Sequence, residues 1–337
     1  MRHLPPLPHL RAAFGPSASW PDAGAARRHG LAPLWGAWHT AGDPDPRLTV
    51  CRDDHRDTVA REILLRSALW EILGAYVPVT TPPLVLKGMA RVLADLPRPG
   101  LRPMLDLDLL VRACDLRALG GALSRCGFRP VPHGQIHWRR DGASPLDVDL
   151  HVAEDLPVRL DLSRPRALAT LHGATAHGLD PVEDFLWTAV HAFLLHAWPR
   201  GIWLLDLRLL LDRIAREGRQ DAVAERMRGA GLGRLLGEAD AFLGGRRPRS
   251  RAPWAWRRLR DSWDGRGGAG EGEFLLLLAS RDPVLSRLRR AWRIAFPSPP
   301  FLRRRYPSLP LGAARAMRVA QLAVRTGRAL ARPRTRG

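Results

Sequence analysis

Two aspartates, Asp106 and Asp108, lie two positions apart in an apolar run that reads MLDLDLLV over residues 104–111. The alternation predicts a β-strand, in which residues two apart project from one face at a spacing of about 6.6 Å. Two carboxylates on one face among leucines and valine are costly unless a positive charge lies between them. A divalent metal ion would supply that charge, because hard cations prefer carboxylate oxygen. A solvent-facing edge strand is the alternative explanation.

A single lysine precedes this acid pair. Lys87 is the only lysine in the chain, and it lies between the apolar run Leu84–Leu86 and Gly88. Where arginine is used almost everywhere else, a lone lysine indicates a need for a compact ammonium rather than a planar guanidinium, unless it is a chance survivor. Gly88 predicts either a simple turn or a close approach of the backbone to a phosphate. Arg102, just before the acid strand, is either a surface arginine or a second phosphate-binding group.

A later strand supplies a third acid. Residues 146–152 read LDVDLHV, so Asp147 and Asp149 share one strand face, and His151 shares it too. Asp149 is the favoured third acid, with Asp147 left open as the alternative. His151 either orients the site or packs in the core. Asp206, inside an apolar helical segment, is expected to form a buried ion pair.

The elements that must position these residues follow from periodicity and punctuation. Strands are predicted at 84–86, 104–111, 128–132, 135–139 and 146–152. Helices are predicted at 53–76, 89–93, 116–125 with Asp115 as N-cap and Gly127 just past its end, from Asp180 onward, at 203–214, within 220–243, and at 254–263, 273–290 and 311–330. The pattern is α+β: a small mixed β-sheet core with flanking helices and a mostly helical C-terminal half.

Composition and charge limit the class of protein. The 337 residues are 45% hydrophobic, which is ample for a core, and the formal net charge is +20. Residues 246–337 hold 23 arginines against five acidic residues, whereas residues 1–245 hold 30 basic and 28 acidic residues. The basic C-terminal region therefore predicts a nucleic acid, an anionic surface or an acidic partner.

Cysteine usage and hydropathy indicate a cytoplasmic protein. The three cysteines, Cys51, Cys114 and Cys126, have no C-x-x-C spacing, which disfavours a disulfide framework or a structural zinc site. No secretory signal is evident, and no run of 18 apolar residues predicts a transmembrane segment.

The order of the motifs carries a resemblance. LVLKG, LRPMLDLDLLV, CGFRP, His137 and VDLHV follow one another along the chain. This order resembles the nucleotidyltransferase superfamily that includes DNA polymerase β, and more closely the bacterial uncharacterised nucleotidyltransferase family. That family has an LKG turn, R-x-x-x-D-x-D, a helix ending in a Gly-aromatic pair, and V-D-L-H. The resemblance covers about residues 55–215, including PVEDFLWTAVHAFLLHAW and WLLDLRLLL. Met89 departs from the wider superfamily, where Ser or Gly usually follows this glycine.

The predicted elements and the charge distribution give a domain order, and the resemblance implies a chemistry. The order is an irregular segment 1–52, a nucleotidyltransferase-like catalytic core 53–155, a helical domain 156–245 and the basic helical region 246–337. Asp106 and Asp108 would hold Mg²⁺, or Mn²⁺, on a nucleoside triphosphate, with ATP favoured, and Asp149 would complete a two-metal site or act as base. Gly88, Lys87 and Arg102 would contact the triphosphate.

The implied reaction transfers a nucleoside monophosphate to a hydroxyl or phosphate of a small molecule, peptide or protein, and pyrophosphate leaves. Two alternatives stay open. One is nucleotide addition to RNA such as tRNA, with the basic region 246–337 following the phosphates. The other is a non-catalytic nucleotide-binding or scaffold protein whose helix 311–330 docks to a membrane or a partner.

Overall fold

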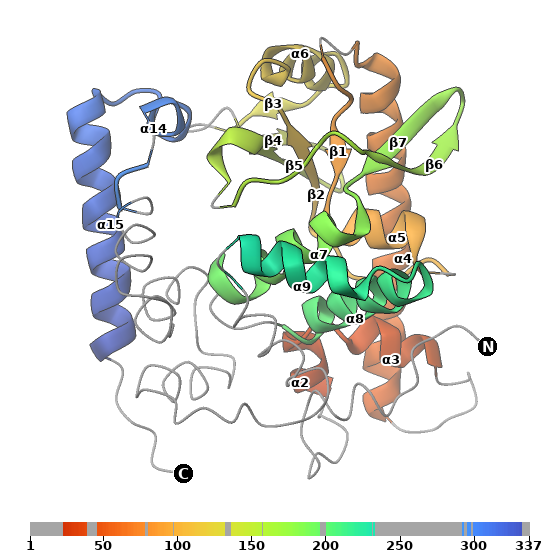
Figure 1. Cartoon of the computed structure of the whole chain (residues 1–337). Helices are drawn as coiled ribbons and strands as arrows, with labels where there is room; N and C mark the ends of the chain where they lie inside the picture. The colour runs from red at the N-terminus through yellow and green to blue at the C-terminus, as the bar shows by residue number, and fades with distance from the viewer. Residues whose placement is uncertain are drawn as a thin grey trace.

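The computed structural model describes residues 23–38, 46–77, 80–96, 98–131, 136–156, 158–195, 200–230, 232, 292, 295–297 and 299–331. Within these ranges the chain is α+β, as predicted: a seven-stranded mixed sheet is flanked by helices (Figure 1). Some predictions concern residues outside the described ranges. They are residues 1–22 and 39–45 of the N-terminal segment, residues 231 and 233–243 of the predicted helical stretch, and the helices 254–263 and 273–290.

The sheet has the strand order β3-β4-β5-β2-β1-β7-β6. Its strands are β1 (Leu84–Val85), β2 (Asp106–Val111), β3 (Arg129–Pro130), β4 (His137–Arg140), β5 (Leu146–Val152), β6 (Arg166–Leu171) and β7 (Ala174–Gly178). The central strands β2 and β5 are parallel, with Asp108 opposite Asp149. On the other side of β5, β4 runs antiparallel and places His137 opposite Asp149.

One face of the sheet is covered by helices. α4 (Pro46–Ala75), α5 (Lys87–Ala94) and α6 (Leu116–Arg125) contribute apolar side chains to a core with this face. The strands contribute alternate residues to the same core, including Leu107, Leu109, Val148 and Leu150. Because strand side chains alternate, the aspartates between these leucines and valines must lie on the opposite face.

A second layer of helices packs against part of the sheet face that carries the aspartates. α7 (Pro181–Ala189), the π-helix Val190–Leu195, α8 (Gly201–Arg216) and α9 (Gln220–Gly229) build a second core around Leu84, Leu86 and Leu110. In Figure 1 these helices lie below the sheet. Asp180 begins α7 as predicted, since its Oδ1 accepts a hydrogen bond of 3.0 Å from the backbone N–H of Val182.

The remaining helices lie at the two ends of the described chain. α2 (Ala23–Arg28) and α3 (Ala32–Trp38) pack near α4, while α14 (Pro299–Arg305) and α15 (Leu311–Ala331) form a separate pair (Figure 1). Arg304 of α14 forms an ion pair with Asp155, just after β5. Among the described residues, no helix is both long enough and apolar enough to cross a bilayer.

Two local predictions differ from the structure. Asp115 precedes α6 as predicted, but its side chain does not cap the helix. It is fully buried and accepts hydrogen bonds from the Thr80 backbone N–H at 2.9 Å and the Tyr76 hydroxyl at 3.2 Å, so it anchors the segment before β1 instead. The β6–β7 hairpin was not predicted. It extends the sheet beyond residue 155 through a parallel pairing of β7 with β1, while the four-segment domain division stays a prediction.

Candidate active site

Three carboxylates meet on the sheet face opposite α4 and α6. Oxygen atoms of Asp106, Asp108 and Asp149 lie within 4.8 Å of one another. The parallel register of β2 and β5 causes this, because it places Asp108 directly beside Asp149. Asp108 is buried, and the other two are half-buried.

Two cationic or hydrogen-bonding groups hold Asp108. The Lys87 ammonium donates to Asp108 Oδ1 at 2.6 Å, and His151 Nε2 lies 2.7 Å from the same oxygen. Burial alone would raise the pKa of Asp108, but Lys87 and His151 outweigh it and hold that pKa well below its usual range. Asp108 is therefore a carboxylate at any physiological pH.

The turn that carries Lys87 is unusual. Lys87 has φ 49°, in the left-handed region. A non-glycine residue there costs about 1–2 kcal/mol, so the surrounding contacts must hold it. The turn leads directly from β1 into α5, and it directs the Lys87 side chain to Asp108.

Asp106 has the opposite electrostatic environment. Burial and the neighbouring Asp108 raise the pKa of Asp106 to about 6, although Lys87 acts against this. Within the described residues, three carboxylates thus share one lysine and compete for their charge. Clustered carboxylate oxygens are the ligands that Mg²⁺ and Mn²⁺ prefer, so this donor set fits a divalent ion.

The other acid on β5 has a different partner. Asp147 is held by Arg139, whose Nε and Nη2 donate at 2.7 and 3.1 Å. Asp149 forms a hydrogen bond with His137 Nδ1, and the other ring nitrogen of His137 lies 3.5 Å from Asp147. The two acids share a strand face as predicted, and the geometry groups Asp149, not Asp147, with Asp106 and Asp108.

His137 is a site residue whose contact sequence reasoning missed. The signal was present: β4 carries His137 and Arg139 two positions apart, which matches the i, i+2 aspartates of β5. Only the β4–β5 register, which no local pattern defines, converts that spacing into contacts. Residues 132–135, which include His133, are outside the ranges that the structure describes.

Gly88 and Arg102 lie next to one another behind the lysine turn. A Cβ at Gly88 would lie 2.6 Å from Met104 Cγ and 3.0 Å from Arg102 Nη1. Close packing therefore already requires glycine here, while contact of its backbone with phosphate stays a prediction. Arg102 is buried and donates to Asp206 through Nε at 3.3 Å and Nη2 at 2.8 Å. The ion pair predicted for Asp206 is thus confirmed.

This pair extends a set of buried charges behind the site. Arg91 pairs with Asp95 and Asp184, and Arg213 pairs with Asp95. The contacts tie α5, which follows the lysine turn, to α7 and α8. They fix the position of the turn relative to the helical layer.

A series of aromatic rings connects His151 of β5 with α7, the π-helix and α8. The His151 ring is 5.5 Å from that of Trp187, which is 6.2 Å from His191, and His191 is 5.0 Å from Trp203. His191 packs between helices, as the sequence predicts; His196 and Trp198, expected to do the same, lie outside the described residues.

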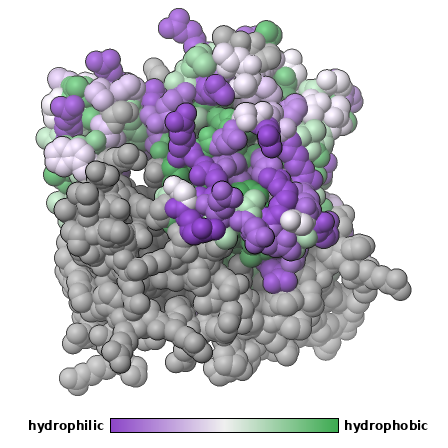
Figure 2. Space-filling view, in the orientation of Figure 1, coloured by the Kyte–Doolittle hydropathy of each residue, from purple (hydrophilic) through white to green (hydrophobic). Residues whose placement is uncertain are grey.

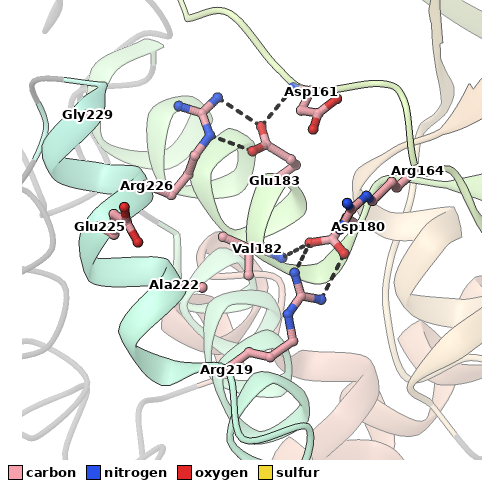
Figure 3. A pocket seen from close by; sticks show the side chains of 10 residues that line it. All are labelled: Asp161, Arg164, Asp180, Val182, Glu183, Arg219, Ala222, Glu225, Arg226 and Gly229. Carbon is pink, nitrogen blue, oxygen red and sulfur yellow. Dashed lines mark hydrogen bonds and ion pairs between the residues drawn. The ribbon is translucent and has the colours of Figure 1, made fainter.

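A separate cavity of about 400 Å³ lies between α7, α9 and the loop at 161–164. Hydrophilic side chains gather over α9 (Figure 2). In the cavity, Arg219 pairs with Asp180, and Arg226 pairs with Glu183 (Figure 3). None of the six predicted site residues lines it. Arg219 and Arg226 are thus each paired with a carboxylate, whereas the three acids on the sheet share one lysine.

Comparison with known proteins gives one match. A family model described as "Uncharacterised nucleotidyltransferase" matches residues 22–242. No curated protein matches the chain, and neither does any solved structure.

Proposed function

The chain belongs to the uncharacterised nucleotidyltransferase family, and we propose that Asp106, Asp108 and Asp149 form its Mg²⁺-dependent active site. As a nucleotidyltransferase it is an enzyme that moves a phosphorus-containing group. The proposed donor is a nucleoside triphosphate, with ATP favoured, and the acceptor presents a hydroxyl or phosphate on a small molecule, peptide or protein. Pyrophosphate is the second product.

The observation that carries this proposal is the charge imbalance of the site. Three carboxylates lie within 4.8 Å of one another beside one lysine. Asp106, Asp108 and Asp149 would hold Mg²⁺, with Mn²⁺ as a substitute. A bound divalent ion would neutralise negative charge on the phosphates and orient them.

The lysine turn would bind the donor. The Lys87 ammonium contacts Asp108 at 2.6 Å, so it lies where an ion-bound triphosphate would come within reach. Arg102 would be a second phosphate-binding group beside Gly88, although its guanidinium is paired with Asp206 in this structure. Both cations stabilise charge that develops on the leaving pyrophosphate.

Asp149 would act on the acceptor. It lies on the β4 side of the site, away from Lys87, and hydrogen-bonds His137. When the acceptor is a hydroxyl, its oxygen forms a bond to the α-phosphorus and the bond from that phosphorus to the bridging oxygen of the β-phosphate breaks. Asp149 takes the hydroxyl proton, and His137 orients the carboxylate for it.

The position of a radioactive label tests the reaction class. The full chain is incubated with Mg²⁺, cell extract and ATP labelled either at the α- or at the γ-phosphate. Nucleotidyl transfer places α-label on an acceptor and sends γ-label into pyrophosphate. Acceptor labelled only from the γ-position would show a kinase, and no label transfer from any of the four nucleoside triphosphates would remove the proposal.

A second candidate acceptor is RNA. Residues 299–331, which hold α14 and α15, contain seven arginines and no acidic residue. An RNA-directed enzyme would lose RNA affinity steeply as salt increases. A gel-shift titration at 50 and 200 mM salt checks this, and a shift that is absent or insensitive to salt would exclude it.

A further inference from the structure

The face that carries the acids continues into a row of arginines. β3 and β4 place Arg129 opposite Arg139, and β4 and β5 place Arg139 opposite Asp147. Asp147 in turn lies opposite Asp106 of β2. Residues that are directly opposite share a face, so Arg129, Arg139, Asp147 and Asp106 form one line across four strands.

The outer end of this line has excess positive charge. Like charges directly opposite on neighbouring strands destabilise a sheet, and Arg129 and Arg139 are such a pair. The Asp147 carboxylate compensates the charge of Arg139, from which it accepts hydrogen bonds. Arg129 is exposed and makes no hydrogen bond or ion pair with another described residue.

A third guanidinium approaches from α4. Arg61 donates to the carbonyl of Leu105 at 2.6 Å and to the carbonyl of Pro145, just before β2 and β5. These neutral partners leave its charge uncompensated. Arg139 thus pairs with Asp147, Arg61 lies at the start of β2 and β5, and Arg129 lies one strand beyond Arg139.

From this arrangement we propose that Arg61, Arg129 and Arg139 bind a phosphomonoester carried by the acceptor. The inference rests on the proposed function, because it assigns the β3–β4 side to the acceptor and the Lys87 side to the donor. A phosphomonoester carries close to two negative charges at neutral pH, and guanidinium groups supply the positive charge to bind it. The fork of Arg129 fits phosphate oxygens in a pair, and Arg139 and Arg61 would add the N–H groups that Asp147 and the two carbonyls do not occupy.

The test measures binding of phenyl phosphate to the full chain by calorimetry. Mg²⁺ and a non-hydrolysable ATP analogue are present at saturation, so that the donor site is filled. The variants are Arg129→Gln, Arg139→Gln and their combination. Arg117→Gln is the matched control, because Arg117 is exposed on α6, which packs on the other face of the sheet.

Wild type and Arg117→Gln should bind phenyl phosphate with affinities that agree within about twofold, and the double variant should bind at least about tenfold more weakly. Arg129→Gln keeps the Arg139–Asp147 pair, so its weakened binding cannot come from a broken sheet. Equal binding by wild type and the double variant would overturn the proposal. So would an octamer of deoxythymidine that binds more tightly than phenyl phosphate and depends on the same arginines, because it would indicate phosphodiesters.

The outcome is separable from the reaction itself. If wild type transfers no label yet binding depends on the arginines, the proposed function fails and the phosphate site stands. If label is transferred while binding ignores the arginines, only the phosphate site fails.

Discussion

Two clusters of the same residue types lie within one fold and differ in charge balance. Behind the lysine turn, Arg91, Arg102 and Arg213 face Asp95, Asp184 and Asp206, three against three. On the sheet, three aspartates face one lysine. The side chains of Arg91 and Asp184 are only 2% and 3% exposed, so charges there must be paired.

The difference separates a structural role from a chemical one. In the buried set every carboxylate has an arginine, and removing one partner would leave a charge without compensation. In the acid site three aspartates share one lysine, and a divalent ion would supply the missing positive charge. Loss of an acid should therefore harm folding in the first cluster and catalysis in the second.

The largest expected effect is on catalysis. Asp108→Asn should lower kcat for nucleotidyl transfer by more than about 10³-fold, or about 4 kcal/mol, because it removes a charged ligand of the ion. The metal-free protein should also lose some stability, because Lys87 and His151 lose the carboxylate that they share. Transfer rates from α-labelled ATP and urea unfolding check the two halves, and a variant that keeps wild-type kcat would contradict the site assignment.

The reverse pattern is expected in the buried set. Asp184→Asn leaves Arg91 with Asp95 alone and should cost about 3 kcal/mol of unfolding free energy. The folded fraction should still transfer label, since Asp184 contacts none of the three acids in the described structure. Urea unfolding measures the loss. A stability equal to wild type would show that the balanced set is not structural.

Loss of the lysine should have an intermediate effect on catalysis. Lys87→Met removes the cation 2.6 Å from Asp108 and should lower kcat about 10²-fold. Lys87→Arg keeps the charge, but a planar fork replaces a point-like ammonium. If Lys87→Arg matched wild type, charge alone would suffice and the preference for lysine would lose its chemical explanation.

A smaller effect concerns pH. Without a bound ion, burial and Asp108 raise the pKa of Asp106 in the folded state to about 6, above its ordinary value of 3.8. The protonated form of Asp106 therefore adds to the free energy of unfolding. This contribution is fully present below about pH 4 and is lost as the pH rises through 6. Relative to Asp106→Asn, wild type should lose on the order of 2 kcal/mol between pH 4 and 7.

Urea unfolding of both proteins across this range measures the difference, and other titrating groups cancel between them. Mg²⁺ should restore the stability of wild type at pH 7 and leave Asp106→Asn nearly unchanged. A difference that does not vary with pH would mean that the acids are not crowded.

Local patterns predicted much of what holds these clusters. Alternation defined β5 over Leu146–Val152, and helical spacing and Gly127 defined α6 over Leu116–Arg125, both with the observed bounds. Both are amphipathic, so burial of one face follows directly from periodicity. The placement of Asp106 and Asp108 on one face followed in the same way.

Long-range pairing was not predictable in this way. Asp115 looks like a helix cap, yet Thr80 and Tyr76 from an earlier segment occupy its carboxylate. The choice of Asp149 over Asp147 depends on strand register and on Arg139 and His137, which local propensity does not specify. β6 and β7 are short and mostly half-buried or exposed, so they lack the strong alternation that identified the central strands.

Direct titration of Mn²⁺, followed by electron paramagnetic resonance, tests the central claim. Mn²⁺ prefers carboxylate oxygen and reports free and bound ion separately. Wild type should bind Mn²⁺, Asp108→Asn should lose that binding, and Asp221→Asn, an exposed acid on α9, should keep it. Equal Mn²⁺ binding by Asp108→Asn and wild type, or none by wild type, would contradict the assignment of the three acids as the metal site.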